Sequence, residues 1–343
     1  MKTVFVGLSG GVDSSVTAAL VKEQGYHVVG VYMKNWSQDL PGFACPWKED
    51  YQDAKRVAVQ LGIDFEMFDF ETEYREKVVD YMIDEYKAGR TPNPDIMCNQ
   101  EVKFKLFLNT ALDKGADFVA TGHYARVRDG KLYTGLDTNK DQSYFLYRVT
   151  EEALTKTLFP LGEYTKPQVR ELAAERNLIT ATKKESMGIC FVGKVGIKEF
   201  LQQYVTTMPG AIVDQFGRTI GEHDGAIFYT IGQRHGLDVG GGLPYYVVGK
   251  DMTKNEVYVT TQLDDERLWL EELTLTDLHW INKAPKPGKK YQIRVRYRAP
   301  LVEAVFSDDL QHLQLTDAVR AVTPGQSTVV YDGDYVVGGG IVI

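Results

Sequence analysis

The chain has 343 residues, 43% of them hydrophobic and 25% charged, and a formal net charge of −8 at neutral pH. This length is more than one hydrophobic core usually organises, so we expect two or three domains. No apolar run is long enough to span a bilayer, and the chain does not start with a basic segment followed by an apolar one, which favours a cytoplasmic protein without membrane contact. Three cysteines without C-x-x-C spacing argue against a disulfide scaffold and a zinc site, so no protein-built metal site is expected.

The first stretch with a chemical signature follows a short apolar strand, Val4–Val6. Gly7 ends this strand, the sequence SGGVDS covers residues 9–14, and a helical pattern continues to Gly25. Adjacent glycines let backbone N–H groups converge, and the start of a helix attracts negative charge. A Walker A loop would need a lysine that is absent here. The stretch instead resembles the pyrophosphate loop of the ATP-pyrophosphatase superfamily, which implies that ATP is cleaved between its α and β phosphates.

The next part of the chain alternates strands and helices. Val28–Met33, Phe65–Phe70 and Asp117–Thr121 have the pattern of buried strands, which predicts an α/β domain with a doubly wound, mostly parallel sheet. Ligands gather at the carboxyl ends of such strands, so Met33 is a candidate for contact with adenine. Gly122 suits close approach of the backbone to a ligand, and His123 is a plausible contact to nucleotide or substrate.

From Met208 onward, glycine-rich turns separate short strands and helical periodicity nearly disappears. We therefore expect two small all-β domains after the α/β domain, the last of them a β-barrel. The predicted domains cover residues 1–207, 208–267 and 268–343.

Two cysteines lie in segments that suit reactive thiols. Arg90–Asn99 contains two prolines separated by one residue, which predicts a stiff, exposed loop with Cys98 at the start of the following helix. Unpaired N–H groups there would lower the pKa of the Cys98 thiol, and Asp95 could act as a general acid or base. Cys190 follows a glycine turn and two lysines, Lys183 and Lys184, that would favour its thiolate. The alternative that Cys190 is a buried, inert thiol stays open.

A basic cluster near the end of the chain stands out against the acidic total; its members are Lys283, Lys286, Lys289, Lys290, Arg294, Arg296 and Arg298. Alternation places the three arginines on one face of a strand, where they could contact the phosphates of single-stranded or loop RNA. Tyr297 at the end of the strand could stack on a base. A solvated basic face is the alternative.

Together the motifs resemble the tRNA-specific 2-thiouridylase family, which replaces the 2-oxygen of the wobble uridine with sulfur. The matching stretches are GLSGGVDSS, AGRTPNPDIMCN, ATGHYA, NKDQSYFLY, LGEYTKPQVRELA, ESMGICF, TIGQRHGL, YYVVGKD, VRYR, AVTPGQS and GGGI. The resemblance covers nearly the whole chain and implies an adenine-nucleotide α-hydrolase-like fold for its first domain. It also implies two cofactors, ATP and Mg²⁺.

The resemblance implies a role for particular residues. Cys98 corresponds to the nucleophile, Cys190 to the persulfide carrier and Asp95 to a residue near the target base. The ATP contacts it implies are Gly7, Leu8, Ser9, Gly10, Gly11, Val12, Asp13, Ser14, Met33 and Gly122. The tRNA contacts it implies are Asn93, Pro94, Asp95, His123, Lys140, Asp141, Gln142, Tyr297, Arg298 and Gln326.

The expected reaction begins when the uridine oxygen attacks ATP, which gives an adenylated base and pyrophosphate. Cys190 receives sulfur from an upstream persulfide donor. Cys98 then either releases sulfide by attacking that persulfide or resolves a direct persulfide attack on the base, and a cellular reductant restores both thiols. The expected partner is the anticodon region of tRNA, whose target base must leave its stack.

Three other interpretations stay open at this point. The chain could be an ATP-pyrophosphatase ligase or amidotransferase that adds nitrogen, although both cysteines would then be idle. It could be an RNA-binding module that senses ATP without chemistry. Asp95, Cys98 and Cys190 could also be ligands of an iron–sulfur cluster.

Overall fold

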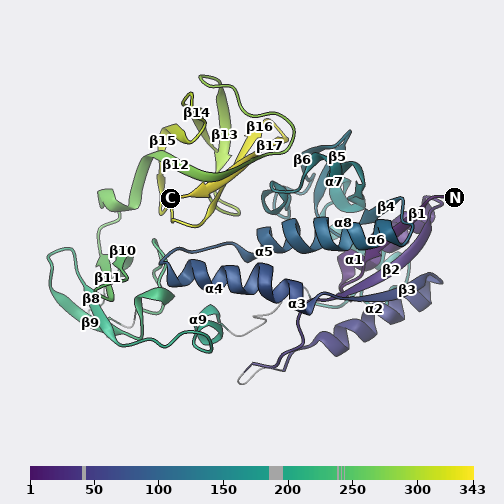
Figure 1. Cartoon of the computed structure of the whole chain (residues 1–343), viewed down its shortest axis with the longest axis horizontal. Helices are drawn as coiled ribbons and strands as arrows, with labels where there is room; N and C mark the ends of the chain where they lie inside the picture. Colours follow the sequence, from purple (N-terminus) through teal and green to yellow (C-terminus); the bar gives the residue numbers. More distant parts are fainter. Residues whose placement is uncertain (41–43, 185–195, 238, 241, 243) are drawn as a thin grey trace.

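The structure is a computed structural model that describes residues 1–40, 44–184, 196–237, 239–240, 242 and 244–343. Figure 1 shows three parts: an α/β layer structure that holds the N-terminus, a small sheet near residues 210–260, and a β-barrel that holds the C-terminus. The α/β class followed by β modules is therefore confirmed.

The α/β part is built on a five-stranded sheet with the order β3-β2-β1-β4-β7, and its neighbouring strands are all parallel. The strands are β1 (Thr3–Gly7), β2 (His27–Lys34), β3 (Asp64–Asp69), β4 (Phe118–Ala120) and β7 (Thr157–Leu158). β1 is buried from Val4 to Gly7 because helices cover both faces of the sheet. The strand order reverses between β1 and β4, so a ligand crevice is expected at the carboxyl ends of these two strands.

Helices and short turns fill the connections of this sheet. The helices of the α/β part are α1 (Val12–Glu23), α2 (Trp47–Leu61), α3 (Glu71–Tyr74), α4 (Asp80–Lys87), α5 (Pro94–Met97), α6 (Leu108–Asp113), α7 (Glu151–Thr155), α8 (Lys166–Glu175) and α9 (Ile197–Leu201). Wider π-type turns join α3 to α4 (η1, Arg75–Val79) and α5 to α6 (η2, Cys98–Phe107), and 3₁₀ turns form η3 (Ser143–Leu146) and η4 (Pro160–Glu163).

The barrel has six antiparallel strands and is closed by pairing of β12 with β17. Its strands are β12 (Trp269–Trp280), β13 (Lys290–Arg294), β14 (Val302–Phe306), β15 (His312–Arg320), β16 (Ser327–Asp332) and β17 (Tyr335–Val342). Alternating side chains such as Leu273, Ile293 and Phe306 fill its interior. The predicted C-terminal β-barrel is confirmed.

A hairpin of the α/β part extends the sheet of the barrel. β5 (Ala125–Arg128) and β6 (Lys131–Thr134) turn at Asp129 and Gly130, both with positive φ, as the Asp-Gly pair predicts. β6 then pairs with β17 through Tyr133 and Tyr335. A strand pair that follows directly after β4 is thus continuous with the barrel, which the sequence did not indicate.

The central module is a four-stranded sheet with the order β10-β11-β8-β9. It contains β8 (Gly210–Val213), β9 (Thr219–His223), β10 (Tyr246–Asp251) and β11 (Glu256–Thr260), with 3₁₀ turns η5 (Ala226–Phe228) and η6 (Glu266–Leu268). One hydrophobic cluster runs from Phe5 in β1 through Ile212 and Val247 to Val329 and Val336 in the barrel. The three parts therefore share a core, and the exact boundaries at 207 and 267 stay a prediction. No helix in the described ranges is long and apolar enough to cross a membrane.

Candidate active site

The loop after β1 has the backbone geometry of a phosphate cradle. Gly10 has φ +73°, and a Cβ atom there would lie 2.5 Å from the carbonyl oxygen of Asp50, so only glycine fits. Gly11 is extended and leads into α1, whose N-terminus has no side-chain cap among the residues that the structure describes. The Ser14 hydroxyl accepts a hydrogen bond from the Ser9 N–H (3.2 Å) and donates one to the Gly11 carbonyl (3.0 Å). The loop is held open with helix N–H groups available to an anion.

Gly7, Met33 and Gly122 lie next to this loop, as expected for residues at the reversal point of the sheet. A Cβ atom on Gly122 would be 3.0 Å from the backbone carbon of Asp13 and 3.1 Å from the Ser14 nitrogen. A Cβ atom on Gly7 would be 3.1 Å from the Met33 methyl carbon. The structure therefore brings these predicted ATP contacts together, and their contact with ATP stays a prediction.

A buried lysine that the sequence analysis missed pairs with the aspartate of the loop. Lys166 Nζ lies 2.7 and 2.8 Å from the two carboxylate oxygens of Asp13, and the Tyr124 hydroxyl donates to the same carboxylate at 2.8 Å. Lys166 is only 8% exposed, at the start of α8, where Thr165 and Gln168 form a capping box. The local sequence marks this helix start, but nothing in it points to a partner 153 residues away.

The segment that carries Cys98 differs from its prediction. A helix already begins at Pro94, because proline suits the first helical position and the Asn93 side chain accepts hydrogen bonds from the N–H groups of Asp95 and Ile96. Cys98 therefore lies one turn inside a helical run, its own N–H bonded to helix carbonyls, and is 3% exposed. The expected exposed loop, with Cys98 at an unsatisfied helix start, is wrong.

Both β modules hold the beginning of this segment. The Thr91 N–H donates to the Pro324 carbonyl (2.8 Å), and the Gln326 amide donates to the Thr91 carbonyl (2.8 Å). The Thr91 hydroxyl is 3.2 Å from the hydroxyl of Thr230 in the central module. Gly325 has φ +91°, and a Cβ atom there would lie 2.8 Å from the Thr91 nitrogen. Gln326, a predicted tRNA contact, thus lies beside the cysteine segment.

The positive charge of Lys103 acts on two predicted site residues, Asp95 and His123. Burial raises the pKa of Asp95, and the charge of Lys103 partly opposes this rise. Burial, with a smaller contribution from Lys103, lowers the pKa of His123 well below its usual range, so its ring is neutral at pH 7. The His123 Nδ1 lies 2.8 Å from the Thr121 hydroxyl and its Nε2 lies 3.5 Å from Lys103 Nζ. The RNA contact predicted for His123 is therefore that of a neutral ring.

The other predicted RNA contacts lie where the turn before η3 meets the barrel. The Arg298 guanidinium donates to the Asn139 carbonyl (3.0 Å), and the Tyr297 ring packs on Phe145 with centroids 4.4 Å apart. The Gln142 side chain accepts a hydrogen bond from the Tyr124 N–H (3.0 Å). These contacts place the turn that carries Lys140 against the barrel.

The Asp141 carboxylate is buried and accepts hydrogen bonds from the Gly135 and Ser143 N–H groups, so it stabilises this turn.

The predicted row of three arginines is wrong. β13 ends at Arg294, and Arg298 has φ +63°, so strand alternation does not continue to it. The Arg294 side chain is 17% exposed, lies over the Tyr331 ring and is 3.5 Å from the Asp141 carboxylate. Of the three, Arg296 and Arg298 are exposed.

The predicted persulfide carrier Cys190 lies outside the described residues. Lys183 pairs with Asp50 (2.9 Å) and Asp53 (2.7 Å) of α2. Its expected effect on the Cys190 thiolate stays a prediction. Asp50 also lies against Gly10, so Lys183 is close to the phosphate loop. In the part of the chain that the structure describes, no group of three or more His, Cys, Asp or Glu side chains could hold a metal ion.

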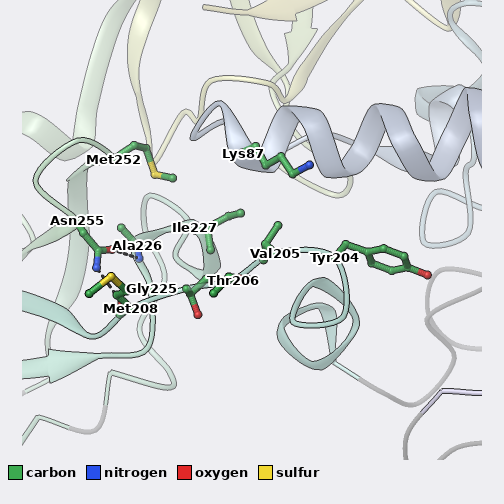
Figure 2. Close-up of a pocket in the computed structure, with 11 residues that line it drawn as sticks. Lys87, Tyr204, Val205, Thr206, Met208, Gly225, Ala226, Ile227, Met252 and Asn255 are labelled. Atoms are coloured by element: carbon green, nitrogen blue, oxygen red, sulfur yellow. Dashed lines mark hydrogen bonds between the residues drawn. The ribbon is translucent and has the colours of Figure 1, made fainter.

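A cavity of about 450 Å³ lies between the end of α4 and the central module, with Lys87, Tyr204, Met208, Ile227 and Met252 in its wall (Figure 2). None of the predicted site residues lines it. It is therefore separate from the candidate active site.

A parallel sheet with a glycine-rich loop at its reversal point, followed by two β modules, defines the class: an α/β protein whose first domain matches a HUP-domain description. Three family descriptions match the chain in succession: tRNA methyl transferase HUP domain (residues 2–194), tRNA methyl transferase PRC-barrel domain (198–261) and aminomethyltransferase beta-barrel domain (270–342). The tRNA-specific 2-thiouridylase MnmA of Neisseria meningitidis serogroup C (strain 053442) is 51% identical over 99% of this chain and 95% of that protein. The protein of the same name from Bacillus subtilis (strain 168) is 48% identical over 99% and 94%. The chain belongs to the tRNA-specific 2-thiouridylase family, a family of tRNA-uridine 2-sulfurtransferases, as its motifs suggested.

Proposed function

We propose that this chain uses ATP to replace the 2-oxygen of the wobble uridine of tRNA with sulfur. The observation that carries the proposal is the arrangement of the site: the phosphate cradle, the turn that carries the predicted RNA contacts, and the Cys98 segment held by both β modules. Full-length relatives of about half identical sequence that bear the thiouridylase name support the same reaction.

ATP fits the cradle because the loop offers backbone N–H groups and glycines that leave room for phosphates. Lys166 neutralises Asp13 and thereby removes a negative charge from beside the phosphates. Mg²⁺ would be held chiefly by the phosphate oxygens, where it stabilises charge as pyrophosphate leaves. Gly122 lets α1 approach β4 closely enough to keep the cradle in place.

The sulfur step uses two thiols. Cys190 would carry a persulfide delivered by an upstream donor protein, and the Cys98 thiolate would attack its inner sulfur, forming a disulfide and releasing hydrosulfide. Hydrosulfide then adds to the adenylated C2, and AMP leaves with the former uridine oxygen. A cellular reductant supplies two electrons and two protons to restore both thiols. Direct attack of the persulfide on C2, with Cys98 resolving the adduct, has the same overall balance.

Asp95 lies three residues before Cys98, and its raised pKa suits a group that holds a proton close to the reacting base. A carboxyl with a raised pKa can take part in proton transfer as the tetrahedral adduct forms and collapses. The charge of Lys103 opposes part of the rise in the Asp95 pKa that burial causes.

The decisive experiment compares Cys98→Ser, Cys190→Ser and Cys45→Ser in the presence of tRNA, ATP, Mg²⁺ and a persulfide donor. Mass spectrometry of the tRNA nucleosides measures 2-thiouridine, and isothermal titration measures ATP binding. We expect loss of thiolation by at least about 10³-fold in the first two variants with unchanged ATP affinity, since each lacks a reacting sulfur. Cys45 is partly buried and is absent from the proposed reaction, so its variant serves as the control.

Four outcomes would contradict the proposal. Normal thiolation by Cys98→Ser refutes the two-thiol reaction. Incorporation of nitrogen or a methyl group in place of sulfur indicates an amidotransferase or a methyltransferase. ATP binding without pyrophosphate release in the presence of tRNA indicates a sensor. Iron in anaerobically purified protein would support the cluster interpretation instead.

A further inference from the structure

A second concave site, away from the candidate active site, lies where the β5–β6 hairpin meets the barrel. It encloses about 480 Å³. The residues that define it here, and that we call the lysine cradle, are Lys131, Tyr133, Asn282, Lys283, Lys286 and Tyr335.

Contacts between segments distant in sequence shape this cradle. Tyr133 of β6 pairs with Tyr335 of β17, and their ring centroids are 5.7 Å apart. The Asn282 amide donates to the Gly130 carbonyl (3.3 Å) and accepts from the Tyr335 hydroxyl (2.9 Å). The Lys286 N–H donates to the Tyr291 hydroxyl at 2.9 Å. The backbone that carries the lysines is therefore fixed before any ligand binds.

The cradle is strongly basic although the chain has a net charge of −8. Its wall includes one acidic residue, Asp332, which already pairs with Lys289. Lys131, Lys283 and Lys286 are exposed and form no ion pair with any residue in the described ranges. Three uncompensated cations around one hollow attract a polyanion.

The position of the cradle relative to the active site limits which anion it binds. β5 starts at Ala125, directly after Tyr124, whose hydroxyl contacts Asp13. At about 3.3 Å per residue, the hairpin tip at Gly130 lies up to about 16 Å from the start of β5. The lining of the cradle includes no residue of the phosphate loop, so an ATP held in that loop is not its ligand. The backbone of an RNA whose target base enters the site can span a distance within this limit.

We propose that the lysine cradle binds backbone phosphates of the tRNA outside the anticodon loop. This inference rests on the proposed function and adds a second contact to it. Because hairpin and barrel form one sheet, a phosphate bound here fixes the RNA relative to β4 and the active site. Lysine contacts of this kind position the RNA without reading its sequence.

The test compares Lys283→Gln/Lys286→Gln with the control Lys55→Gln/Lys254→Gln, which removes two exposed lysines from α2 and from the turn between β10 and β11. The affinity for full-length tRNA is measured without ATP at several salt concentrations. Each lost phosphate contact lowers the slope of log K against log[salt] by about 0.7–0.9, so the cradle variant should lose about 1.5. Near 0.1 M salt, a slope reduced by this amount corresponds to an affinity for tRNA roughly 30-fold weaker than that of the wild type. Lys131→Gln alone should remove about one contact.

Further readouts separate the cradle from the active site. At saturating tRNA the cradle variant should keep the wild-type kcat of thiolation, while its KM for tRNA rises by the same factor as its dissociation constant. Its affinity for an RNA that consists of the anticodon loop alone should not change. Three results would each overturn the proposal that the cradle binds tRNA: equal effects in the control variant, an unchanged salt slope, or an equal loss of affinity for the loop RNA. A wild-type protein that binds no tRNA would instead refute the proposed function.

Discussion

The phosphate loop and the Cys98 segment, the two halves of the proposed active site, are built in different ways. The loop is made by adjacent residues: Gly10, Gly11 and Ser14 set its shape through their own φ angles and hydrogen bonds. The Cys98 segment is held at Thr91 by the barrel and by the central module, more than 130 residues along the chain. Binding of ATP should therefore depend on local residues, whereas sulfur transfer should depend on how the three parts pack.

The largest effect is expected from a substitution that displaces the phosphate loop, the half built from adjacent residues. In Gly122→Val, the new side chain would collide with the backbone of Asp13 and Ser14, where even a Cβ atom lies at 3.0 and 3.1 Å. Misplacing the loop by about 1 Å should raise the KM for ATP by about 100-fold. Gly240→Val is the matched control, because a Cβ atom there meets nothing within 4 Å. ATP binding of Gly122→Val that equals the control would contradict the role of this close approach.

The second largest effect is expected from a substitution that displaces the Cys98 segment, which the β modules hold in place. Gly325→Ala combines an unfavourable φ of +91° with a contact of 2.8 Å to Thr91, whereas the control Gly333→Ala has φ +65° and open space. Both variants carry the strain of a left-handed residue, about 1 kcal/mol, and only the first displaces the Cys98 segment. We expect thiolation to fall about tenfold in Gly325→Ala relative to Gly333→Ala, with an unchanged dissociation constant for ATP. A matching loss of ATP binding would show that the two halves are not separate.

The same distinction explains what could be predicted from the sequence. Turns and strands with local signals can be predicted: the loop at residues 9–14, the hairpin whose turn is the Asp-Gly pair at 129–130, and the parallel strands that alternate with helices. The helix start at Pro94 was missed although its signals, Asn93 as cap and proline in the first turn, are local. Two prolines close together favour a loop, but the second one occupies the first position of the helix, where proline is well tolerated.

Contacts across the chain could not be predicted. The pairing of Lys166 with Asp13, and the addition of the β5–β6 hairpin to the barrel, depend on which elements meet in space. The end of β13 at Arg294, whose side chain packs on Tyr331, has no signal in the local sequence. Alternation in the sequence continues past the point where the strand stops.

A smaller effect is expected from removing the ion pair between Lys166 and Asp13 beside the phosphate loop. Lys166→Met leaves the Asp13 carboxylate without its cation beside the phosphate site, so repulsion should raise the dissociation constant of ATP about tenfold, equivalent to about 1.4 kcal/mol. Asp13→Asn removes the unpaired charge. If neutralising Asp13 is the main role of Lys166, the double variant should bind ATP more tightly than Lys166→Met alone. A double variant weaker than both single variants would indicate that Lys166 contacts ATP directly.

The smallest expected effect concerns Asp95, next to Cys98. Burial raises the pKa of Asp95 in the folded protein, so its ionised form costs stability, and this cost grows as the pH rises from about 4, the usual pKa of an aspartate, through the raised value. Asp95→Asn should therefore have a higher Tm than the wild type at pH 8, and the difference should shrink toward pH 4. Thiolation by the variant should be weaker, and it should lack the decline with rising pH that loss of the Asp95 proton causes in the wild type. A Tm difference that instead grows toward low pH would contradict the raised pKa. Full activity of the variant at every pH would show that the carboxyl takes no part in the reaction, and proton transfer would then have to be assigned to another group.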